Sequence, residues 1–188
     1  MPPSQQIPTE HYRLNQRLTV YISEIKEGLR GSEIIVSRAH KGLISALLRR
    51  EVPEVAQGSV IVKEVAREAG SRSKVAGLSM QAGVDPVGSC GGQNGVRIQA
   101  VINELGGVEK IDVIQWSEDP ARLIAQALSP AKDLTVSIDE EKKEAKATAP
   151  DDQLSLAIGR EGQNVRLASK LTGYKIEIRG KTEGQLKK

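Results

Sequence analysis

Aromatic residues and cysteine are nearly absent from this sequence. Phenylalanine does not occur, aromatic residues make up 2% of the chain, and Cys90 is the single cysteine. Hydrophobic cores must therefore be built from Ile, Leu, Val and Ala, and a ligand site made of stacked aromatic rings is not expected. One cysteine excludes an internal disulfide framework and is typical of a reducing compartment. We expect Cys90 to be a small buried residue rather than a nucleophile.

Membrane-spanning and secretory patterns are also missing. No apolar run approaches the roughly 18 residues that a membrane span needs. The N-terminus lacks the basic segment followed by an apolar segment that marks a secretory signal. These features predict a cytoplasmic protein with no membrane partner.

The motifs of common enzymes are absent as well. The chain has no GxxxxGK[ST] phosphate loop, no GxGxxG fingerprint and no His/Cys metal spacing. Its two histidines, His11 and His40, are far apart, and no acid is placed to complete a relay with them. We therefore expect no enzymatic activity, no cofactor and no metal site. The net charge of +3 and the pI near 9.0 are only mildly basic, so the placement of charge has to indicate the ligand.

Glycine pairs with the spacing Gly-x-x-Gly are the most informative pattern in the chain. Four such strings occur among 18 glycines: Gly28/Gly31, Gly88/Gly91, Gly92/Gly95 and Gly159/Gly162. Only the last two lie between predicted helices and are followed by a short alternating strand. Two such units in one chain predict a pair of small binding modules.

The predicted elements repeat in the same order around these two turns. The order is helix, two strands, short helix, glycine turn, helix and strand, which predicts an α+β fold. Asp85, Asp119 and Asp151 are expected to cap helices. The predicted domains are a poorly ordered segment 1–16, a hairpin 17–38, a first module 39–116, a second module 117–180 and a flexible tail 181–188.

A turn of this kind suits a nucleic-acid backbone. Glycine at both ends removes Cβ atoms and permits positive φ, and the following helix directs free N–H groups and a positive dipole end outward. In the second copy, Arg160 and Glu161 lie inside the turn. Gln163, Arg166 and Lys170 then form a polar, cationic stripe on the following helix, for which an ordinary solvated helix face is the alternative. The predicted binding residues of this copy are Gly159, Arg160, Glu161, Gly162, Gln163, Arg166 and Lys170.

The first copy is weaker in charge. Gln93 and Asn94 bring hydrogen-bonding groups but no charge, so we expect this loop to contribute less phosphate affinity than the second. Its predicted binding residues are Gly92, Gln93, Asn94, Gly95 and Arg97. A candidate extension of the nucleic-acid track consists of Arg67, Arg72 and Lys74, near the turn between the first module's strands. The alternative for these three residues is a solvated hairpin edge that discourages aggregation.

Longer motifs connect the chain to a known family. The segments SEDPARLIAQALSPA (117–131), LSLAIGREGQNVRLASKLTGYKIEI (154–178), VSRAHKGL (36–43), EVPEVAQGSV (51–60) and AREAGSRSKVA (66–76) closely resemble the bacterial NusA family of transcription termination/antitermination factors. The resemblance covers roughly residues 17–180. It implies two tandem KH domains of the prokaryotic type (type II), preceded by the last strands of an S1 barrel, which is an OB-fold, at 17–38. The family's polymerase-binding domain and most of its S1 barrel have no counterpart here. The first loop also departs from the family pattern, because it lacks an apolar residue before GxxG and a basic residue within it.

The resemblance also implies a function and partners. A KH domain binds single-stranded RNA by clamping about four nucleotides of backbone at its GxxG loop. The implied function is non-catalytic binding of nascent or leader transcripts during elongation, pausing, termination and antitermination. RNA polymerase and other elongation factors are implied as partners. The alternative is a protein-interaction scaffold within a transcription complex, with little direct RNA binding.

Overall fold

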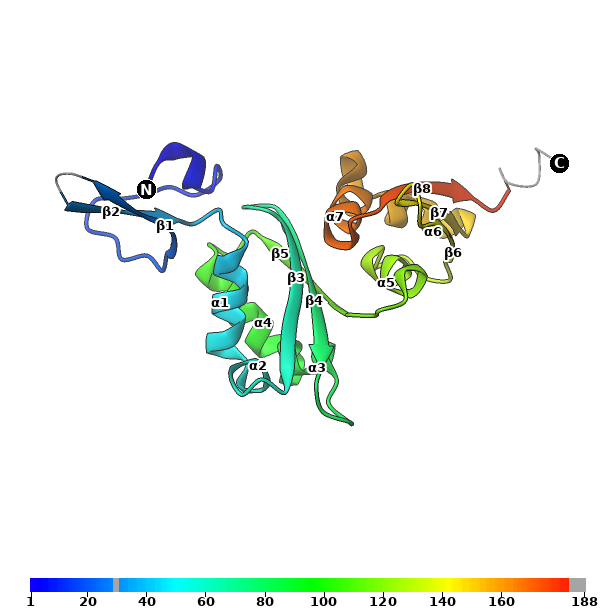
Figure 1. Cartoon of the computed structure of the whole chain (residues 1–188), viewed down its shortest axis with the longest axis horizontal. Coiled ribbons are helices and arrows are strands. Elements are labelled where there is room, and N and C mark those ends of the chain that lie inside the picture. Colours follow the sequence, from blue (N-terminus) through cyan, green and yellow to red (C-terminus); the bar gives the residue numbers. More distant parts are fainter. Residues whose placement is uncertain (29–30, 183–188) are drawn as a thin grey trace.

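The computed structural model describes residues 1–28 and 31–182. Near the N-terminus, a short 3-10 helix η1 (Pro3–Gln5) precedes the antiparallel strands β1 (Tyr21–Gly28) and β2 (Gly31–Ser37). These strands form a separate two-stranded sheet, which confirms the expected hairpin (Figure 1). Several of its apolar side chains are more than half exposed, including Ile22, Ile25 and Ile34. Of the tail that we expected to be flexible, residues 183–188 lie outside the described range.

The first module is a three-stranded sheet covered by helices. Its sheet has the order β3-β4-β5, with β3 antiparallel and β5 parallel to the central strand β4. In Figure 1, α1 and α4 lie on one side of this sheet. The elements are α1 (Gly42–Glu51), α2 (Pro53–Ala56), β3 (Val60–Glu68), β4 (Arg72–Ser79), α3 (Pro86–Gly91), η2 (Gln93–Gly95), α4 (Val96–Glu104) and β5 (Lys110–Gln115).

The second module repeats this order almost element by element. Its sheet has the order β6-β7-β8, again with one antiparallel and one parallel pair. The elements are α5 (Pro120–Ala127), β6 (Thr135–Asp139), β7 (Glu144–Ala149), α6 (Asp151–Ile158), η3 (Arg160–Gly162), α7 (Gln163–Thr172) and β8 (Lys175–Gly180). The α+β fold with two related modules, predicted from the sequence, is confirmed.

Two of the three predicted helix caps form. The Asp85 carboxylate accepts hydrogen bonds from the N–H groups of Val87 and Gly88, and Asp119 accepts one from Ala121. In each case a proline follows the cap, where its missing N–H costs nothing. Asp151 is instead the first residue of α6, and its carboxylate bonds Thr182. The predicted cap at Asp151 is therefore wrong.

The sheet of the first module is buried on both faces. Successive side chains of a strand point to opposite faces. Val65 and Val75 pack with α1 and α4 in the module's own core, whereas their neighbours Ala66 and Ala76 belong to a second core on the other face. This second face is covered by α7 of the second module, which contacts both β3 and β4.

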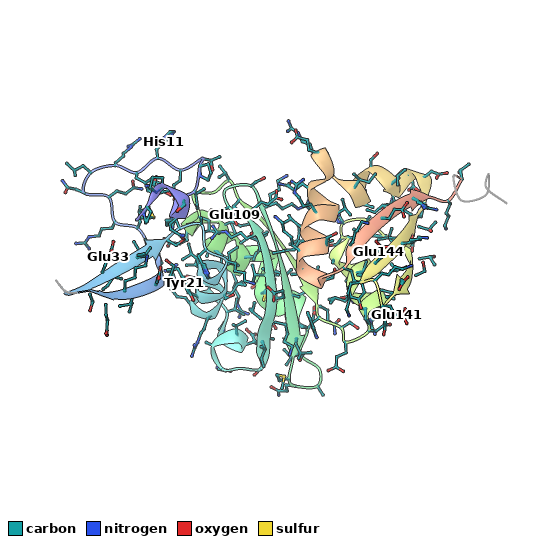
Figure 2. The ribbon with its side chains drawn as sticks, turned by 45° about the horizontal axis from the view of Figure 1, so that its top comes forward. His11, Tyr21, Glu33, Glu109, Glu141 and Glu144 are labelled. Carbon is teal, nitrogen blue, oxygen red and sulfur yellow. The ribbon has the colours of Figure 1, made fainter. Side chains whose placement is uncertain are left out.

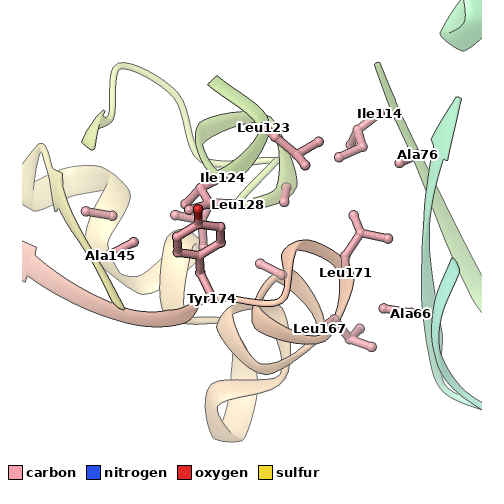
Figure 3. Close-up of a cluster of buried hydrophobic side chains, with 13 residues drawn as sticks. Ala66, Ala76, Ile114, Leu123, Ile124, Leu128, Ala145, Leu167, Leu171 and Tyr174 are labelled. Atoms are coloured by element: carbon pink, nitrogen blue, oxygen red, sulfur yellow. The ribbon is translucent and has the colours of Figure 1, made fainter. Parts of the chain in front are cut away.

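The two modules consequently share one hydrophobic core. Figure 3 shows Ala66, Ala76 and Ile114 of the first module facing Leu167 and Leu171 of α7, with Leu123 of α5 close by. The small alanine side chains on the sheet let α7 approach closely. Trp116, directly before the linker, packs against the same core. The modules are thus held together by apolar burial and not only by the short connection at 117–119.

The N-terminal segment differs from the poorly ordered stretch that the sequence predicts. Ile7 is 1% exposed, and its side chain lies against Gly70. The backbone N–H groups of Arg38 and Ala39 donate to the carbonyl of Gln5. The Arg38 guanidinium is buried and forms an ion pair with Glu10. One buried isoleucine and one buried ion pair therefore fix this segment to the first module.

Candidate nucleic-acid interface

The two glycine turns have the same backbone conformation. Gly92 has φ 70° and ψ −177°, and its counterpart Gly159 has φ 76° and ψ 169°. The third residues, Asn94 and Glu161, both have φ 53°, with ψ of 25° and 27°. A residue other than glycine rarely adopts this left-handed conformation. The two turns that glycine spacing singled out therefore share one backbone geometry, although the residues between the glycines differ.

Each loop is anchored by the side chain five positions after its first glycine. Asn164 is fully buried, and its amide Nδ2 donates to the carbonyls of Leu128 at 2.9 Å, Ala157 at 3.0 Å and Leu156 at 3.2 Å. Arg97 is the counterpart in the first module, where its Nη1 donates at 2.9 Å to Ser89, the residue equivalent to Leu156. The carbonyl three residues before the first glycine of the loop thus accepts a hydrogen bond from the anchoring side chain in both modules.

These anchors explain why the first glycine of each loop carries no side chain. A Cβ atom on Gly92 would lie 2.7 Å from Cγ of Arg97, and one on Gly159 would lie 2.7 Å from Cβ of Asn164. Arg97 also forms an ion pair with Glu54 at 2.9 Å. Because its guanidinium is used behind the loop, Arg97 is a supporting residue in this structure rather than a free cation on the predicted RNA surface.

The second loop presents its two central side chains to solvent. The side chain of Arg160 is 93% exposed and that of Glu161 is 83% exposed, with 3.9 Å between the closest charged atoms. An ion pair this open and this long contributes little. The charge of Arg160 is therefore available to a ligand.

The cationic stripe on α7 faces the first module. Arg166 Nε lies 2.6 Å from Oε1 of Glu68, and Lys170 Nζ lies 3.9 Å from the same atom. The Gln163 amide donates to Glu68 at 2.9 Å and to the Ser71 hydroxyl at 2.8 Å. The hydrogen bond from Arg166 lowers the pKa of Glu68 more than its partial burial raises it. Part of the stripe thus joins the modules, although Arg166 and Lys170 stay about half exposed along one edge.

The candidate extension of the track is wrong for two of its three residues. Arg67 is buried in a bidentate ion pair with Glu109, a fully buried carboxylate at the end of the first sheet nearest the N-terminal segment (Figure 2). Lys74 is also fully buried, and its ammonium donates to the Ser129 carbonyl of the second module at 2.8 Å and to Asp112 at 3.2 Å. Burial lowers the pKa of Lys74. The alternative of a solvated hairpin edge is wrong for the same reason.

Arg72 differs from these two residues because it reaches the surface. Its side chain is 19% exposed and pairs with Asp112 at 2.7 Å. It lines a groove of about 440 Å³ between the modules, formed by Ser71, Arg72 and Lys110 of the first module and Arg160, Glu161, Gln163 and Arg166 of the second. Sequence reasoning missed Lys110, because 48 residues and a module boundary lie between it and the second loop.

A second groove runs along the first loop and the exposed face of α4. It is lined by Gln93, Asn94, Gly95, Val96, Ile98, Gln99, Ala100 and Asn103. Val96, Gln99 and Asn103 occupy the positions that correspond to Gln163, Arg166 and Lys170 in the second module. This surface is therefore uncharged where the equivalent surface of α7 carries two cations.

Other chemistry has little support in the described part of the chain. Cys90 is 1% exposed, as expected, and burial raises the pKa of its thiol to about 11. Among residues 1–28 and 31–182, no three His, Cys, Asp or Glu side chains lie together as metal ligands. None of the helices within these ranges has the length and apolar character needed to span a bilayer.

Two helices joined by a Gly-x-x-Gly turn, packed on a sheet with one antiparallel and one parallel strand pair, define a KH domain of type II, and the chain carries two in tandem. The family model for the NusA-like first KH domain matches residues 38–116, and the one for the NusA-like second KH domain matches residues 120–186. The chain therefore belongs to the NusA family.

Individual relatives agree with this assignment. The chain is 50% identical over 98% of its length to the transcription termination/antitermination protein NusA of Bacillus subtilis, and 53% identical over 95% of its length to that of Thermus thermophilus. It covers 50% and 46% of those proteins, so it spans about half of their length. A crystal structure of APE1850 matches 74% of the chain and 97% of its own length, with a TM-score of 0.53 and 22% identity, which supports the fold alone.

Proposed function

We propose that this chain binds single-stranded RNA without catalysis, using the two GxxG loops as backbone clamps. The observation that supports this function best is the second loop, where both glycines have positive φ and Arg160 is almost fully exposed beside the start of α7. Such a turn lets a phosphate approach the free N–H groups of the helix closely. The bases would then lie along the helix that follows each loop.

The wider role follows from the relatives. The matched proteins bear the name transcription termination/antitermination protein. We therefore propose that the RNA is a nascent or leader transcript and that binding acts on elongation, pausing, termination and antitermination in the cytoplasm. RNA polymerase and other elongation factors are the proposed partners. The hairpin at 17–38 is proposed as the end of an S1 barrel, followed by KH domains at 39–116 and 117–180.

The two loops are not expected to contribute equally. They share one backbone conformation, so a difference in affinity has to come from their side chains and neighbours. The second loop has an exposed arginine, whereas the first has Gln93 and Asn94 and a neighbouring arginine, Arg97, that is paired with Glu54. We propose that the second loop anchors the RNA.

The test compares two double variants. One carries Arg160→Asp and Glu161→Asp, and the other carries Gln93→Asp and Asn94→Asp. Aspartate tolerates the left-handed conformation at the third loop position, so both variants should fold as the parent chain does. We expect the 160/161 variant to lose RNA binding in a fluorescence-anisotropy titration and the 93/94 variant to lose less.

Each outcome has a defined meaning. A folded 160/161 variant with undiminished RNA affinity would refute the clamp and favour a protein-interaction scaffold. A larger loss in the 93/94 variant would reverse the ranking of the loops. Affinity should also fall as salt is raised, because neutralised phosphates release counterions.

A further inference from the structure

The groove between the two modules brings residues of the first module to the second GxxG loop. Ser71, Arg72 and Lys110 lie at the end of the first sheet, where β4 and β5 begin. On the opposite wall, Arg160 and Glu161 belong to the second loop, and Gln163 begins α7. The loop therefore has the first module's sheet as its neighbour.

Hydrogen bonds fix the two walls of this groove. Ser71 accepts a bond from the Gln163 amide of the opposite wall at 2.8 Å. The backbone N–H of Lys110 donates to the carbonyl of the same serine at 3.0 Å. Glu68, at the end of β3, binds Arg166 and Gln163. Lys110 is thus held on a rigid sheet end at a fixed position relative to the second loop.

The charges of the groove are unequally neutralised. Arg72 is paired with Asp112, and Arg166 is paired with Glu68. Lys110 is exposed, and among the residues that the structure describes it has no carboxylate within ion-pair distance. Arg160 has only the long contact with Glu161. A single groove is therefore lined by two cations, one from each module, whose charges are little neutralised by neighbouring carboxylates. None of the described residues that line this groove is apolar.

We infer that Lys110 completes the phosphate site of the second loop, so that an RNA strand held at Gly159–Gly162 continues over the end of the first module's sheet and places a further phosphate between Arg160 and Lys110. A phosphodiester suits this groove because it is anionic and requires donors on both sides, which the ammonium and the guanidinium supply. This inference rests on the proposed function. It adds that the second loop is a composite site which depends on docking of the first module.

The test is a salt-dependent titration of fluorescein-labelled polyuridylate with the whole chain and three variants. Lys110→Gln removes the groove cation. Arg49→Gln is the matched control, since Arg49 is an exposed cation of the first module outside the groove and the net charge changes equally. The 160/161 double aspartate variant reports on the clamp itself. Thermal unfolding and Trp116 emission verify that each variant keeps its fold.

We expect Lys110→Gln to bind about three- to fivefold more weakly at low salt, the upper range for an exposed ion pair. For a single strand, the slope of log affinity against log salt becomes shallower by about 0.7 for each phosphate that the protein no longer neutralises. Lys110→Gln should show this reduction, and Arg49→Gln should show parental affinity and slope.

Failure of this inference is distinguishable from failure of the proposed function. If Lys110→Gln matches Arg49→Gln in affinity and slope while the 160/161 variant loses binding, the composite site is refuted and the RNA clamp stands. If the 160/161 variant binds as the parent chain does, or the parent chain does not bind RNA, both are refuted.

Discussion

Replacing Asn164 by aspartate should destabilise the second module strongly. The side chain is fully buried, and its Nδ2 group serves three carbonyl oxygens at 2.9 to 3.2 Å. A carboxylate cannot donate to any of them. Each buried acceptor left unsatisfied costs about 1–3 kcal/mol, and the two amide hydrogens of Asn164 satisfy two acceptors fully. The added negative charge beside these oxygens raises the cost further. We therefore expect Asn164→Asp to lower the free energy of unfolding by about 3–5 kcal/mol at neutral pH.

The pH dependence of this loss tests its cause. Burial among carbonyls raises the folded-state pKa of the new carboxyl above its unfolded value of about 3.9. The protonated carboxyl can donate one hydrogen bond, so the deficit should be smallest below that unfolded value. It should then grow as the pH rises toward the folded-state pKa. Urea denaturation at a series of pH values, followed by circular dichroism and by emission from Trp116, the one tryptophan in the chain, measures the deficit.

Asn103→Asp provides the matched control. Asn103 is exposed on α4 at a position equivalent to Lys170, and its side chain accepts one surface hydrogen bond from Gln99. The same chemical change there should cost less than about 0.5 kcal/mol. A deficit for Asn164→Asp within about 1 kcal/mol of this control at neutral pH, or a deficit that does not change with pH, would refute the argument that the Asn164 amide holds the loop.

Three further tests address the loop and the module junction. Gly159→Ala should lower the free energy of unfolding by more than about 2 kcal/mol, because φ is +76° and the new Cβ would lie 2.8 Å from the backbone nitrogen of Asn164. Gly162→Ala, whose Cβ would have no neighbour closer than 3.9 Å, should lower it by about 1 kcal/mol. Denaturation of both variants measures the difference. Leu171→Ala should lower the free energy of unfolding by about 2–5 kcal/mol, since the leucine belongs to the core that both modules share. Trp116 emission should change in the same unfolding transition. Two separate unfolding transitions in the parent chain would contradict a shared core. Because Arg166 lowers the pKa of Glu68, this carboxylate stabilises docking above its unfolded pKa of about 4.3, and the stabilisation is lost as the pH falls through the folded-state pKa. The thermal midpoint of the parent chain should therefore exceed that of Glu68→Gln at pH 7 and converge with it near pH 3; a constant difference would contradict the ion pair.

Local signals were sufficient to predict the repeated fold. The hairpins, the helices and the two glycine turns follow from periodicity, from Asp-Pro helix starts and from glycine spacing. The prediction at Asp151 failed because Pro150, rather than the aspartate, precedes the first helical residue. An N-cap preference applies to one position only, and a shift of one residue moves the carboxylate into the helix.

The contacts between the modules could not be predicted in the same way. Lys74 and Arg67 look like surface cations in isolation, yet one donates to a carbonyl of the second module and the other is buried against Glu109. Lys74 lies on the sheet face that the second module covers. Arg67 lies on the opposite face, like Val65, and its guanidinium is enclosed by Glu109 and by the carbonyls of Arg38 and His40, which are 27 to 42 residues away in the sequence. The run Val75-Ala76-Gly77 was an available signal, since strands buried on both faces lose the apolar and polar alternation.

The two glycine loops share one backbone conformation but differ in the side chains they present. Their conformations agree within about 15° at each compared angle although none of the enclosed side chains match, so the glycines and the anchoring side chains suffice to set the loop. If charge within the loop alone decided affinity, Gln93→Arg would give the first loop the same affinity as the second. The second loop also faces Lys110 across the groove, whereas the corresponding face of α4 presents Val96, Gln99 and Asn103. We therefore expect Gln93→Arg to raise RNA affinity in the 160/161 double aspartate background without restoring that of the parent chain. Full restoration in an anisotropy titration would show that the neighbouring module adds nothing.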